Sequence, residues 1–329
     1  MARLRNLSGR AVVVTGASSG IGAATALELA RRGVSVALAA RREDALAAVA
    51  DECRLLGARA AVIPTDVTDA AAVERLADQA VAAFGRLDGW VNNAAVATYG
   101  TLAEVSPEEF RRVIEVNLLG VAYGMRSALR HLRAGEGGVI VNNASVLAEV
   151  AMPYLTAYNA AKHGVRGLSD TVRQELRLSG ERDIAVCTVL PATIDTPFFA
   201  HAGNHTGRSL TPPPPIYPPQ LVARTIVGLL RRPRREAYAG GAARLLALQW
   251  RMLPGVSEWL LGRYAAKAQF GPRPAANTTG NLFGESHDEA SISGGWHGRR
   301  RAALRTSAAL GLAAGAAAVV ARRYAQAHR

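Results

Sequence analysis

The sequence feature that most constrains the fold lies near the amino terminus, where a β-branched run leads directly into a glycine-rich turn. Val12, Val13 and Val14 form a short apolar run that predicts a buried strand. The segment TGASSGIG follows at residues 15–22, and residues 21–32 have the apolar spacing of a helix that ends at Gly33. A strand, a glycine turn and a helix in this order predict the start of a β-α-β unit.

The same alternation continues along most of the chain. Further strands are predicted at residues 34–40, 60–64, 89–92, 138–142, 184–190 and 236–240. Helices are predicted at residues 69–84, 107–133, 157–178 and 221–230. Because alternating strands and helices form parallel sheets covered on both faces, we predict an α/β fold with a Rossmann-like, doubly wound parallel sheet of about seven strands.

The pattern changes in two places. Residues 198–219 contain six prolines and predict an irregular loop that serves as a lid or insertion. Residues 242–269 predict one or two amphipathic helices broken near Pro254-Gly255, and the polar residues 272–295 predict a linker or surface loop. We therefore divide the chain into a Rossmann-like catalytic domain at 1–240, a helical cap with a linker at 241–295, and a basic, Ala/Gly-rich tail at 296–329.

The positive charge is concentrated in this tail. The formal net charge is +13, and residues 296–329 contain seven arginines and no acidic residue. Such a tail is typical of contact with nucleic acid, anionic lipid or an acidic partner, but also of a solvated chain end. Residues 304–321 are rich in Ala, Gly and Val, yet their uncharged part is shorter than the about 20 residues of a spanning helix. A membrane-associated helix and a packed helix both remain hypotheses, and we expect no nucleic-acid partner.

The cysteines and histidines indicate neither a disulfide framework nor a metal site. Cys53 and Cys187 are the only cysteines and lie far apart in sequence. His201 and His205 have no acidic or cysteine neighbour that would complete a metal site, so no metal is predicted. The amino-terminal apolar run is too short for a signal peptide. We expect a cytoplasmic protein, with peripheral attachment or anchoring at a membrane through the carboxyl terminus as the alternative.

The glycine turn predicts a dinucleotide site, because glycines let backbone N–H groups approach a pyrophosphate and the helix N-terminus favours the anion. The candidate contacts in the turn are Gly16, Ser18, Ser19, Gly20, Ile21 and Gly22. The second strand ends at Ala40 without the acid that binds a ribose 2′-hydroxyl, and Arg41 and Arg42 follow. Since arginine pairs well with a 2′-phosphate, NADP(H) is the preferred cofactor. NAD(H), with Arg41 and Arg42 as ordinary solvated charges, is the alternative.

Tyr158 and Lys162 are the candidate catalytic pair. Four residues apart on a helix, they lie on one face. A tyrosine with a pKa of about 10 is a poor base at neutral pH, and a nearby ammonium favours its ionised form. Ser145 follows the predicted strand at 138–142, where its hydroxyl could hold a substrate oxygen. A tyrosine four residues before a lysine is common by chance, so this spacing indicates a catalytic pair only in combination with the other motifs.

Together these residues resemble the short-chain dehydrogenase/reductase family. TGASSGIG matches the family's TGxxxGxG turn, and Asn117, Ser145, Tyr158 and Lys162 have the order and spacing of its catalytic tetrad. Residues 92–95, NNAA, resemble its NNAG motif with Ala95 in place of glycine. Ala192 likewise replaces the glycine of its Pro-Gly pair. The resemblance covers about residues 7–240.

The resemblance implies a role for each matching residue. Tyr158 is the general acid in reduction and the base in oxidation, while Lys162 lowers the tyrosine pKa and binds the nicotinamide ribose. Ser145 orients the substrate oxygen, and Asn117 supports a proton path through water and Lys162. The implied cofactor contacts beyond the glycine turn are Asp66 and Val67 at the adenine, with Asn93, Ala94, Ala95, Pro191, Ile194 and Thr196 along the rest of the pocket.

The implied activity is hydride transfer between NADP(H) and a small-molecule carbonyl or secondary alcohol. A lipophilic substrate is expected should the tail contact a membrane. The family's usual assembly implies a homodimer or homotetramer. The alternative hypothesis is a dinucleotide-binding regulatory or scaffold protein without catalysis.

Overall fold

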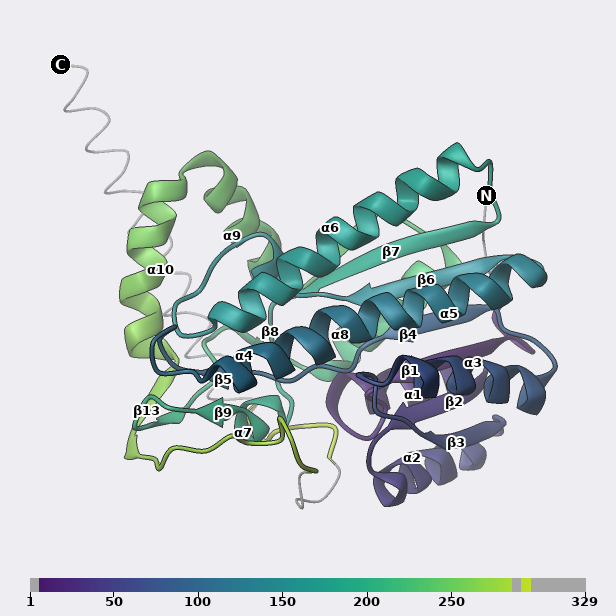
Figure 1. Ribbon diagram of the computed structural model, residues 1–329, viewed down its shortest axis with the longest axis horizontal. Coiled ribbons are helices and arrows are strands. Elements are labelled where there is room, and N and C mark those ends of the chain that lie inside the picture. The colour runs from purple at the N-terminus through teal and green to yellow at the C-terminus, as the bar shows by residue number, and fades with distance from the viewer. Residues whose placement is uncertain (1–5, 286–290, 297–329) are drawn as a thin grey trace.

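The computed structural model describes residues 6–285 and 291–296, and its centre is a seven-stranded sheet (Figure 1). The strand order is β12-β7-β6-β4-β1-β2-β3, and every neighbouring pair is parallel. The strands are β1 Ala11–Thr15, β2 Ser35–Ala40, β3 Ala60–Pro64, β4 Gly89–Asn92, β6 Gly138–Asn143, β7 Ile184–Pro191 and β12 Glu236–Ala239. The predicted Rossmann-like α/β fold with about seven strands is confirmed.

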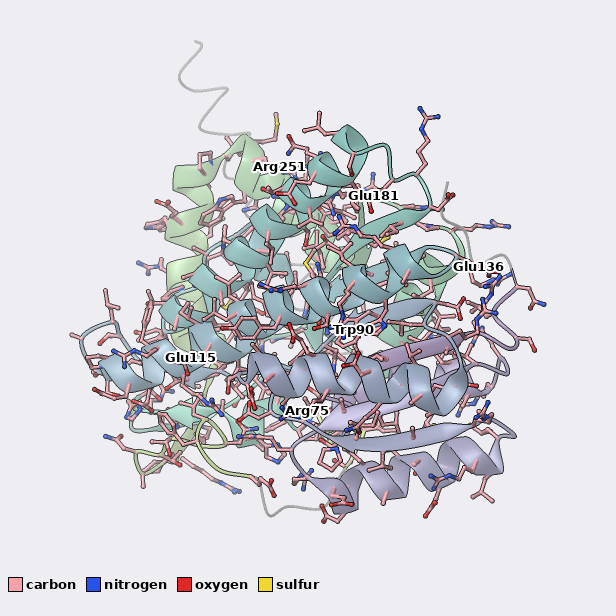
Figure 2. The ribbon with its side chains drawn as sticks, turned by 45° about the vertical axis from the view of Figure 1, so that its right-hand side comes forward. Arg75, Trp90, Glu115, Glu136, Glu181 and Arg251 are labelled. Atoms are coloured by element: carbon pink, nitrogen blue, oxygen red, sulfur yellow. The ribbon has the colours of Figure 1, made fainter. Side chains whose placement is uncertain are left out.

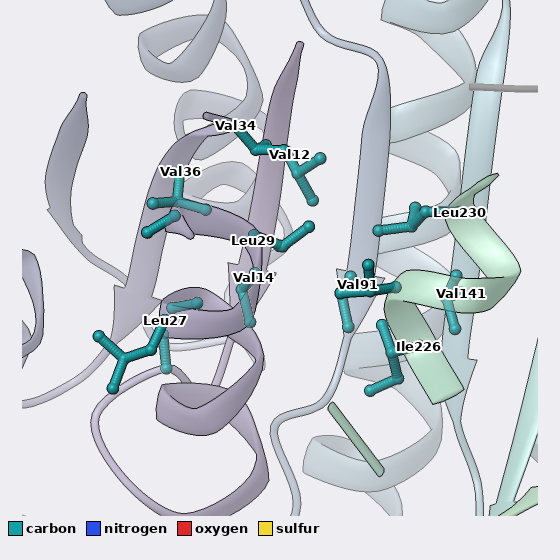
Figure 3. Packing of buried hydrophobic residues seen from close by; sticks show 14 of the residues in the cluster. Val12, Val14, Leu27, Leu29, Val34, Val36, Val91, Val141, Ile226 and Leu230 are labelled. Atoms are coloured by element: carbon teal, nitrogen blue, oxygen red, sulfur yellow. The ribbon is translucent and has the colours of Figure 1, made fainter. Parts of the chain in front are cut away.

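Helices cover both faces of the sheet. One face carries α1, α2 and α8, and the other carries α3, α5 and α6. The helices of the sheet layers are α1 Gly20–Ala30, α2 Glu43–Leu55, α3 Ala70–Phe84, α4 Pro107–Ile114, α5 Gly120–Ala134, α6 Thr156–Leu178 and α8 Pro219–Arg231. Successive strand residues point to opposite faces, so Val12 and Val14 pack under α1 and α8 while Val13 packs on the other side. Figure 3 shows Leu29 of α1 and Ile226 of α8 in the first of these layers.

The strand order places the site. From β1 the chain first builds the sheet in one direction through β2 and β3, and it then returns to form β4 on the other side of β1. The connections after β1 and β4 therefore leave in opposite directions at the carboxyl ends of these strands. In doubly wound sheets this point is a crevice that binds ligands.

The segment at 107–133, predicted as one helix, is divided. It begins with α4, whose N-cap Ser106 forms a reciprocal capping box with Glu109. A π-helical turn, η1 Glu115–Leu119, follows and leads into α5. Apolar periodicity does not distinguish a π turn from an α turn, which is why the prediction missed it. The turn contains Asn117, one of the predicted tetrad residues.

Two segments predicted as irregular contain short regular elements. The segment at 198–219 includes α7 Phe198–His201 and the short strands β9 Gly203–Asn204, β10 Arg208–Leu210 and β11 Ile216–Tyr217. Their partners are, respectively, β5 Thr98–Tyr99, β13 Phe270–Pro274 and β8 Thr193–Ile194. The predictions of a loop at 198–219 and of a linker from 272 onward are therefore wrong in part. Pairing of two or three residues leaves no periodic signal in a sequence.

Two helices follow the last strand of the sheet. They are α9 Gly241–Met252 and α10 Pro254–Ala268, so the predicted break near Pro254-Gly255 is confirmed. Both stand beside the amino-terminal end of α6 in Figure 1. Within residues 6–285 and 291–296, no helix has the length and apolarity needed to cross a membrane. The predicted membrane-associated helix at 304–321 lies outside the described residues.

The sheet is tied together at its amino-terminal edge by a buried carboxylate. Asp88 accepts hydrogen bonds from the Ala11 backbone N–H at 2.9 Å and from the Arg10 and Arg86 side chains, both at 2.7 Å. Burial alone would raise the pKa of Asp88, but these hydrogen bonds outweigh it and hold the pKa below its usual value. Glu136, labelled at the molecular edge in Figure 2, joins both arginines from outside. The cluster joins the start of β1 to the start of β4.

We predict that Asp88→Ala lowers the free energy of unfolding by about 2–4 kcal/mol at pH 7, because the buried Ala11 N–H loses its side-chain acceptor and the two arginines keep, among the described residues, only the exposed Glu136. The native pKa is lowered, so the stabilisation exists above the unfolded pKa of about 4 and is lost as pH falls through the native value. Urea unfolding at several pH values measures both effects.

The control is Asp51→Ala, which removes an exposed partner of Arg54 and should cost less than about 0.5 kcal/mol. Equal losses in the two variants, or an Asp88→Ala loss that stays constant down to pH 3, would contradict the proposed role of the cluster.

Candidate active site

A continuous cavity of about 820 Å³ lies along the carboxyl edge of the sheet. It runs from the glycine turn after β1, past the ends of β4, β6 and β7, to α9 and α10. The predicted site residues that line it are Gly16, Ser18, Ser19, Gly20, Ile21, Arg41, Arg42, Asp66, Val67, Asn93, Ala94, Ala95, Ser145, Tyr158, Lys162, Pro191, Ile194 and Thr196. Only Gly22 and Asn117 among the predicted residues do not line the cavity.

The glycine turn is shaped by close backbone contacts. Gly16 has φ +63°, a left-handed conformation that favours glycine. A Cβ on Gly22 would lie 2.0 Å from the Gly16 carbonyl oxygen, so Gly22 lets the first turn of α1 pack directly on the preceding loop. Gly22 therefore shapes the site without lining it. Ile21, in the first turn of α1, has a backbone N–H with no acceptor among the described residues, as an anion site requires.

Charged residues surround the end of the cavity next to β2 and β3. Asp66 accepts hydrogen bonds from Thr68 and, at 2.9 Å, from Arg112. Burial would raise the pKa of Asp66, but these hydrogen bonds lower it overall. Burial and the neighbouring Arg112 lower the pKa of Arg41, while Asp66 acts in the opposite direction. Arg112 is a cavity residue that the sequence did not reveal, because it lies within a helix far from the glycine turn.

Tyr158, Lys162 and Ser145 converge at the centre of the cavity. Tyr158 and Lys162 lie one turn apart on α6, and the Lys162 Nζ is 5.3 Å from the centre of the Tyr158 ring. The Lys162 side chain is almost fully buried and donates to the Asn143 carbonyl oxygen at 2.9 Å. Ser145 follows β6, and its hydroxyl lies close enough to the Tyr158 phenol to lower the pKa of that group. The three side chains are thus placed around a single reacting point.

Burial has the largest effect on the pKa values of Tyr158 and Lys162. It raises the pKa of the Tyr158 phenol, with the Ser145 hydrogen bond acting in the lowering direction. Burial also lowers the pKa of Lys162 to about 7. The predicted lowering of the tyrosine pKa by Lys162 is therefore outweighed by desolvation of both groups. At neutral pH the phenol holds its proton.

A chain of amide hydrogen bonds joins Lys162 to the glycine turn. Asn143, whose carbonyl binds Lys162, donates from its Nδ2 to the Asn93 Oδ1 at 2.9 Å. The Asn93 Nδ2 in turn donates to the carbonyl oxygens of Thr15 and Gly16 at 3.0 and 3.1 Å. The sequence interpretation missed Asn143, although its position at the end of β6 matches that of Asn93 just after β4. The Asn143 Oδ1 is buried without a partner among the described residues and remains available to a ligand.

Asn117 acts on the backbone rather than in the cavity. Its Oδ1 accepts from the Val96 N–H and its Nδ2 donates to the Val96 carbonyl, both at 2.8 Å. The side chain is fully buried, and each of its two polar atoms has one partner, which leaves one N–H and one acceptor position unused. Asn117 therefore positions the segment that follows β4, and its amide does not reach the cavity wall.

The far end of the cavity combines many apolar side chains with a few polar and charged ones. Its apolar walls come from η2 Val146–Ala148 and the segment after it, from α7 and from α9 and α10, and they include Leu147, Met152, Leu155, Phe198, Phe199, Leu246, Leu260 and Leu261. The polar lining residues of α9 and α10 are Gln249, Arg263, Tyr264 and Lys267. Phe198 packs edge-on against Tyr158, with ring centres 5.7 Å apart. Tyr99, which sequence analysis did not single out, also lines this end, and burial raises its pKa. No cluster of potential metal ligands occurs among the described residues.

Known proteins resemble this chain over much of its length. A model of the short chain dehydrogenase family matches residues 10–206. The cis-4-hydroxycyclohexanecarboxylate dehydrogenase of Sinomonas cyclohexanicum is 41% identical over 231 residues, which are 70% of this chain and 87% of that protein. A short chain dehydrogenase/reductase from Burkholderia phymatum in complex with NAD superposes with a TM-score of 0.67 at 29% identity, covering 75% of this chain and 96% of that one. An alcohol dehydrogenase from the archaeon Thermococcus sibiricus complexed with 5-hydroxy-NADP has a TM-score of 0.61 at 31% identity, with coverages of 70% and 95%.

We predict that Lys162→Met changes the pH dependence of stability. Below pH 7 native and unfolded chains both hold the lysine proton, and the native state bears the cost of burying the charge. Between about pH 7 and 10 the unfolded chain keeps a proton that the native protein has lost, so wild-type stability rises with pH. One pKa unit corresponds to about 1.4 kcal/mol, so at pH 6 the free energy of unfolding of the variant should exceed that of wild type by on the order of 4 kcal/mol. The contribution of the lost hydrogen bond to Asn143 is subtracted from this gain.

Thermal unfolding of both proteins from pH 6 to 10 measures this difference. Lys267→Met, which alters an exposed lysine on α10, is the matched control and should show no such trend. A Lys162→Met difference that is independent of pH would contradict the assignment of a desolvated ammonium.

Proposed function

The chain belongs to the short-chain dehydrogenase/reductase family, and on this premise we propose that it is an NADP-dependent oxidoreductase that interconverts a ketone and a secondary alcohol. One observation carries the proposal. A phenol, a serine hydroxyl and a buried lysine converge in the same cavity that the glycine turn opens into. Neither a dinucleotide site alone nor a catalytic triad alone would need that juxtaposition.

The residues present fit a nicotinamide dinucleotide. The cavity is continuous from the glycine turn to Tyr158, and it offers the unpaired Ile21 N–H at one point and the unpartnered Asn143 Oδ1 at another. The glycine turn would hold the pyrophosphate, Asp66 and Val67 the adenine, and Lys162 and Thr196 the nicotinamide end. When bound, the cofactor supplies or accepts the hydride at the substrate carbon.

The protein's own residues handle the proton. Ser145 and Tyr158 donate hydrogen bonds to the carbonyl oxygen and hold it in one position. Tyr158 then gives its proton to that oxygen as it becomes a hydroxyl. Because burial raises the tyrosine pKa, the phenol is in the acid form that reduction needs. Lys162 stabilises the tyrosinate left behind, since a positive charge one helical turn away favours the anion.

The cofactor preference rests on the end of β2. Ala40 leaves no carboxylate next to a ribose 2′-oxygen, and Arg41 presents a guanidinium to the same end of the cavity. Of the two solved relatives, one is bound to NAD and the other to 5-hydroxy-NADP. Charge at this position is the reason for proposing NADP(H) over NAD(H) here.

The substrate is proposed to be a lipophilic ketone or secondary alcohol. The leucine, methionine and phenylalanine side chains at the far end of the cavity would pack against a hydrocarbon framework, while Gln249, Arg263 and Lys267 could bind a polar group at its end. The Sinomonas relative is named for oxidation of a secondary alcohol on a cyclohexane ring, a group of this kind.

Assembly as a homodimer or homotetramer and contact of the tail with a membrane surface are also proposed. Light scattering of the full chain tests the first, and sedimentation with liposomes tests the second.

We predict that Tyr158→Phe lowers kcat/KM for ketone reduction by about 10²–10⁴-fold, because the proton donor is lost while the cavity keeps its shape. The dissociation constant of NADPH should change by less than about threefold. A panel of cyclic and aryl ketones, followed by the absorbance of NADPH, measures the first quantity and fluorescence titration the second.

Tyr123→Phe removes the same hydroxyl from a residue on α5 outside the cavity and is the control. NADPH binding without turnover of any ketone or alcohol by the wild-type chain would favour the non-catalytic regulatory or scaffold protein instead.

We predict that Arg41→Ala raises the KM for NADPH about 10–100-fold and that for NADH by less than about threefold, because only NADPH carries the phosphate that the guanidinium binds. Steady-state kinetics with both cofactors gives the ratio. Arg54→Ala, which changes an exposed arginine at the end of α2, is the control. An unchanged NADPH-to-NADH ratio would exclude Arg41 as the selecting residue.

A further inference from the structure

The polar segment after β13 returns to the cofactor end of the cavity. The Arg41 Nη2 donates to the Asn281 carbonyl oxygen, and the Arg112 Nε donates to the Leu282 carbonyl oxygen, both at 2.9 Å. The Leu282 side chain is fully buried in the core on the α3, α5 and α6 face. Asn281 and Glu285 line the cavity itself. This part of the chain is therefore anchored where the adenosine half of a dinucleotide would lie.

A second piece of the same region contacts the glycine turn and the end of β7. The Gly20 N–H, in the first turn of α1, donates to the Ser291 carbonyl oxygen at 3.0 Å. Asp195 accepts hydrogen bonds from the Ser293 hydroxyl at 2.7 Å and from the Trp296 N–H at 2.9 Å. Gly294 lies so close to the Thr196 carbonyl oxygen that a Cβ would approach it to 2.3 Å. We call residues 281–285 and 291–296 the carboxyl-terminal strap.

The strap borders the cavity without filling it. The volume of about 820 Å³ remains with the strap in place; Asn281 and Glu285 belong to its lining, while residues 291–296 contact the lining residues Gly20 and Thr196. The Ser291 carbonyl takes the Gly20 N–H of the glycine turn, but the described residues offer no acceptor to the Ile21 N–H, so that donor remains for a phosphate. An inhibitory plug would occupy the groove, whereas this arrangement leaves room for a ligand beside the strap.

We propose that the carboxyl-terminal strap forms the outer wall of the dinucleotide site and retains the bound cofactor. The inference rests on the proposed function only in taking the ligand to be a nicotinamide dinucleotide. The strap lies outside residues 10–206, which match the family model. Cofactor release then requires the contacts at Gly20, Asp195 and Thr196 to open, which makes release slow.

Two glycines of the strap provide a matched test. Gly294→Ala places a methyl group against the Thr196 carbonyl oxygen, whereas a Cβ on Gly284 meets nothing within 4 Å. Both are the same substitution in the full-length chain, and neither glycine has a positive φ. Stopped-flow fluorescence with NADPH, chased by excess NADP, gives the dissociation rate for each protein.

We expect Gly294→Ala to release NADPH about tenfold faster than wild type, and Gly284→Ala to release it at the wild-type rate. Ser293→Ala, which removes the hydroxyl that donates to Asp195 and accepts from the Gly295 N–H, should accelerate release about threefold and serves if Gly294→Ala does not fold. Wild-type release rates in both Gly294→Ala and Ser293→Ala would overturn the proposal. Tighter NADPH binding by either variant would also overturn it, since the strap would then compete with the cofactor.

The ketone panel separates this inference from the proposed function. Suppose that the strap variants release NADPH faster and the wild-type chain turns over no ketone or alcohol. This result would support the strap as a wall of the cofactor site and contradict the proposed enzymatic function. Turnover by the wild-type chain with release rates unchanged in the strap variants would do the reverse.

Discussion

The hydrogen-bond chain from Lys162 through Asn143 and Asn93 to the glycine turn is the interaction on which the site depends. It links the ends of β1, β4 and β6, so Lys162 and the glycine turn, the two centres of the proposed site, are held by one set of backbone and amide groups. The parallel register of these strands brings their carboxyl ends to the same edge. A shift in that register would separate the proton donor from the cofactor groove, because no other described contact ties Lys162 to the turn.

Desolvation explains why such a scaffold is needed. Burying an ammonium is costly, and the protein offsets part of that cost with the Asn143 carbonyl, a neutral acceptor, rather than with a carboxylate. A carboxylate partner would neutralise Lys162 and remove its influence on the tyrosine. The same burial keeps Tyr158 protonated, which suits delivery of a proton to a substrate oxygen. The burial that is costly for Tyr158 and Lys162 is thus also what the proposed proton transfer requires.

The sequence predicts those parts of the molecule that local signals determine. The glycine turn, the apolar strands and the Tyr158–Lys162 spacing each depend on neighbouring residues, and the seven-stranded sheet followed from them. Contacts between distant residues have no such signal, which is why Asn143, Tyr99 and Arg112 were missed. The strap is the clearest case: three of its contacts use the backbone carbonyls of Asn281, Leu282 and Ser291, and backbone groups are the same in every residue. Its side-chain contacts, the buried Leu282 and the Ser293 hydroxyl, are single residues without a periodic pattern. From its sequence alone, a polar, glycine-rich segment that docks in this way is interpreted as a linker.

The charges around Arg41 connect the strap to cofactor choice. Asp66 would attract Arg41 and weaken its field, but Arg112 binds that carboxylate directly at 2.9 Å. The Asn281 carbonyl engages one Arg41 nitrogen and leaves the charge in place, because it is a neutral acceptor. Glu285 acts on Arg41 only through the longer-range electrostatic attraction that raises its pKa. The two arginines are thus balanced formally by Asp66 and Glu285, so the proposed selection of a 2′-phosphate rests on where the Arg41 guanidinium lies and not on a net charge of the cluster. The Asn281 carbonyl holds that guanidinium at the cavity, which links the proposed selecting residue to the strap.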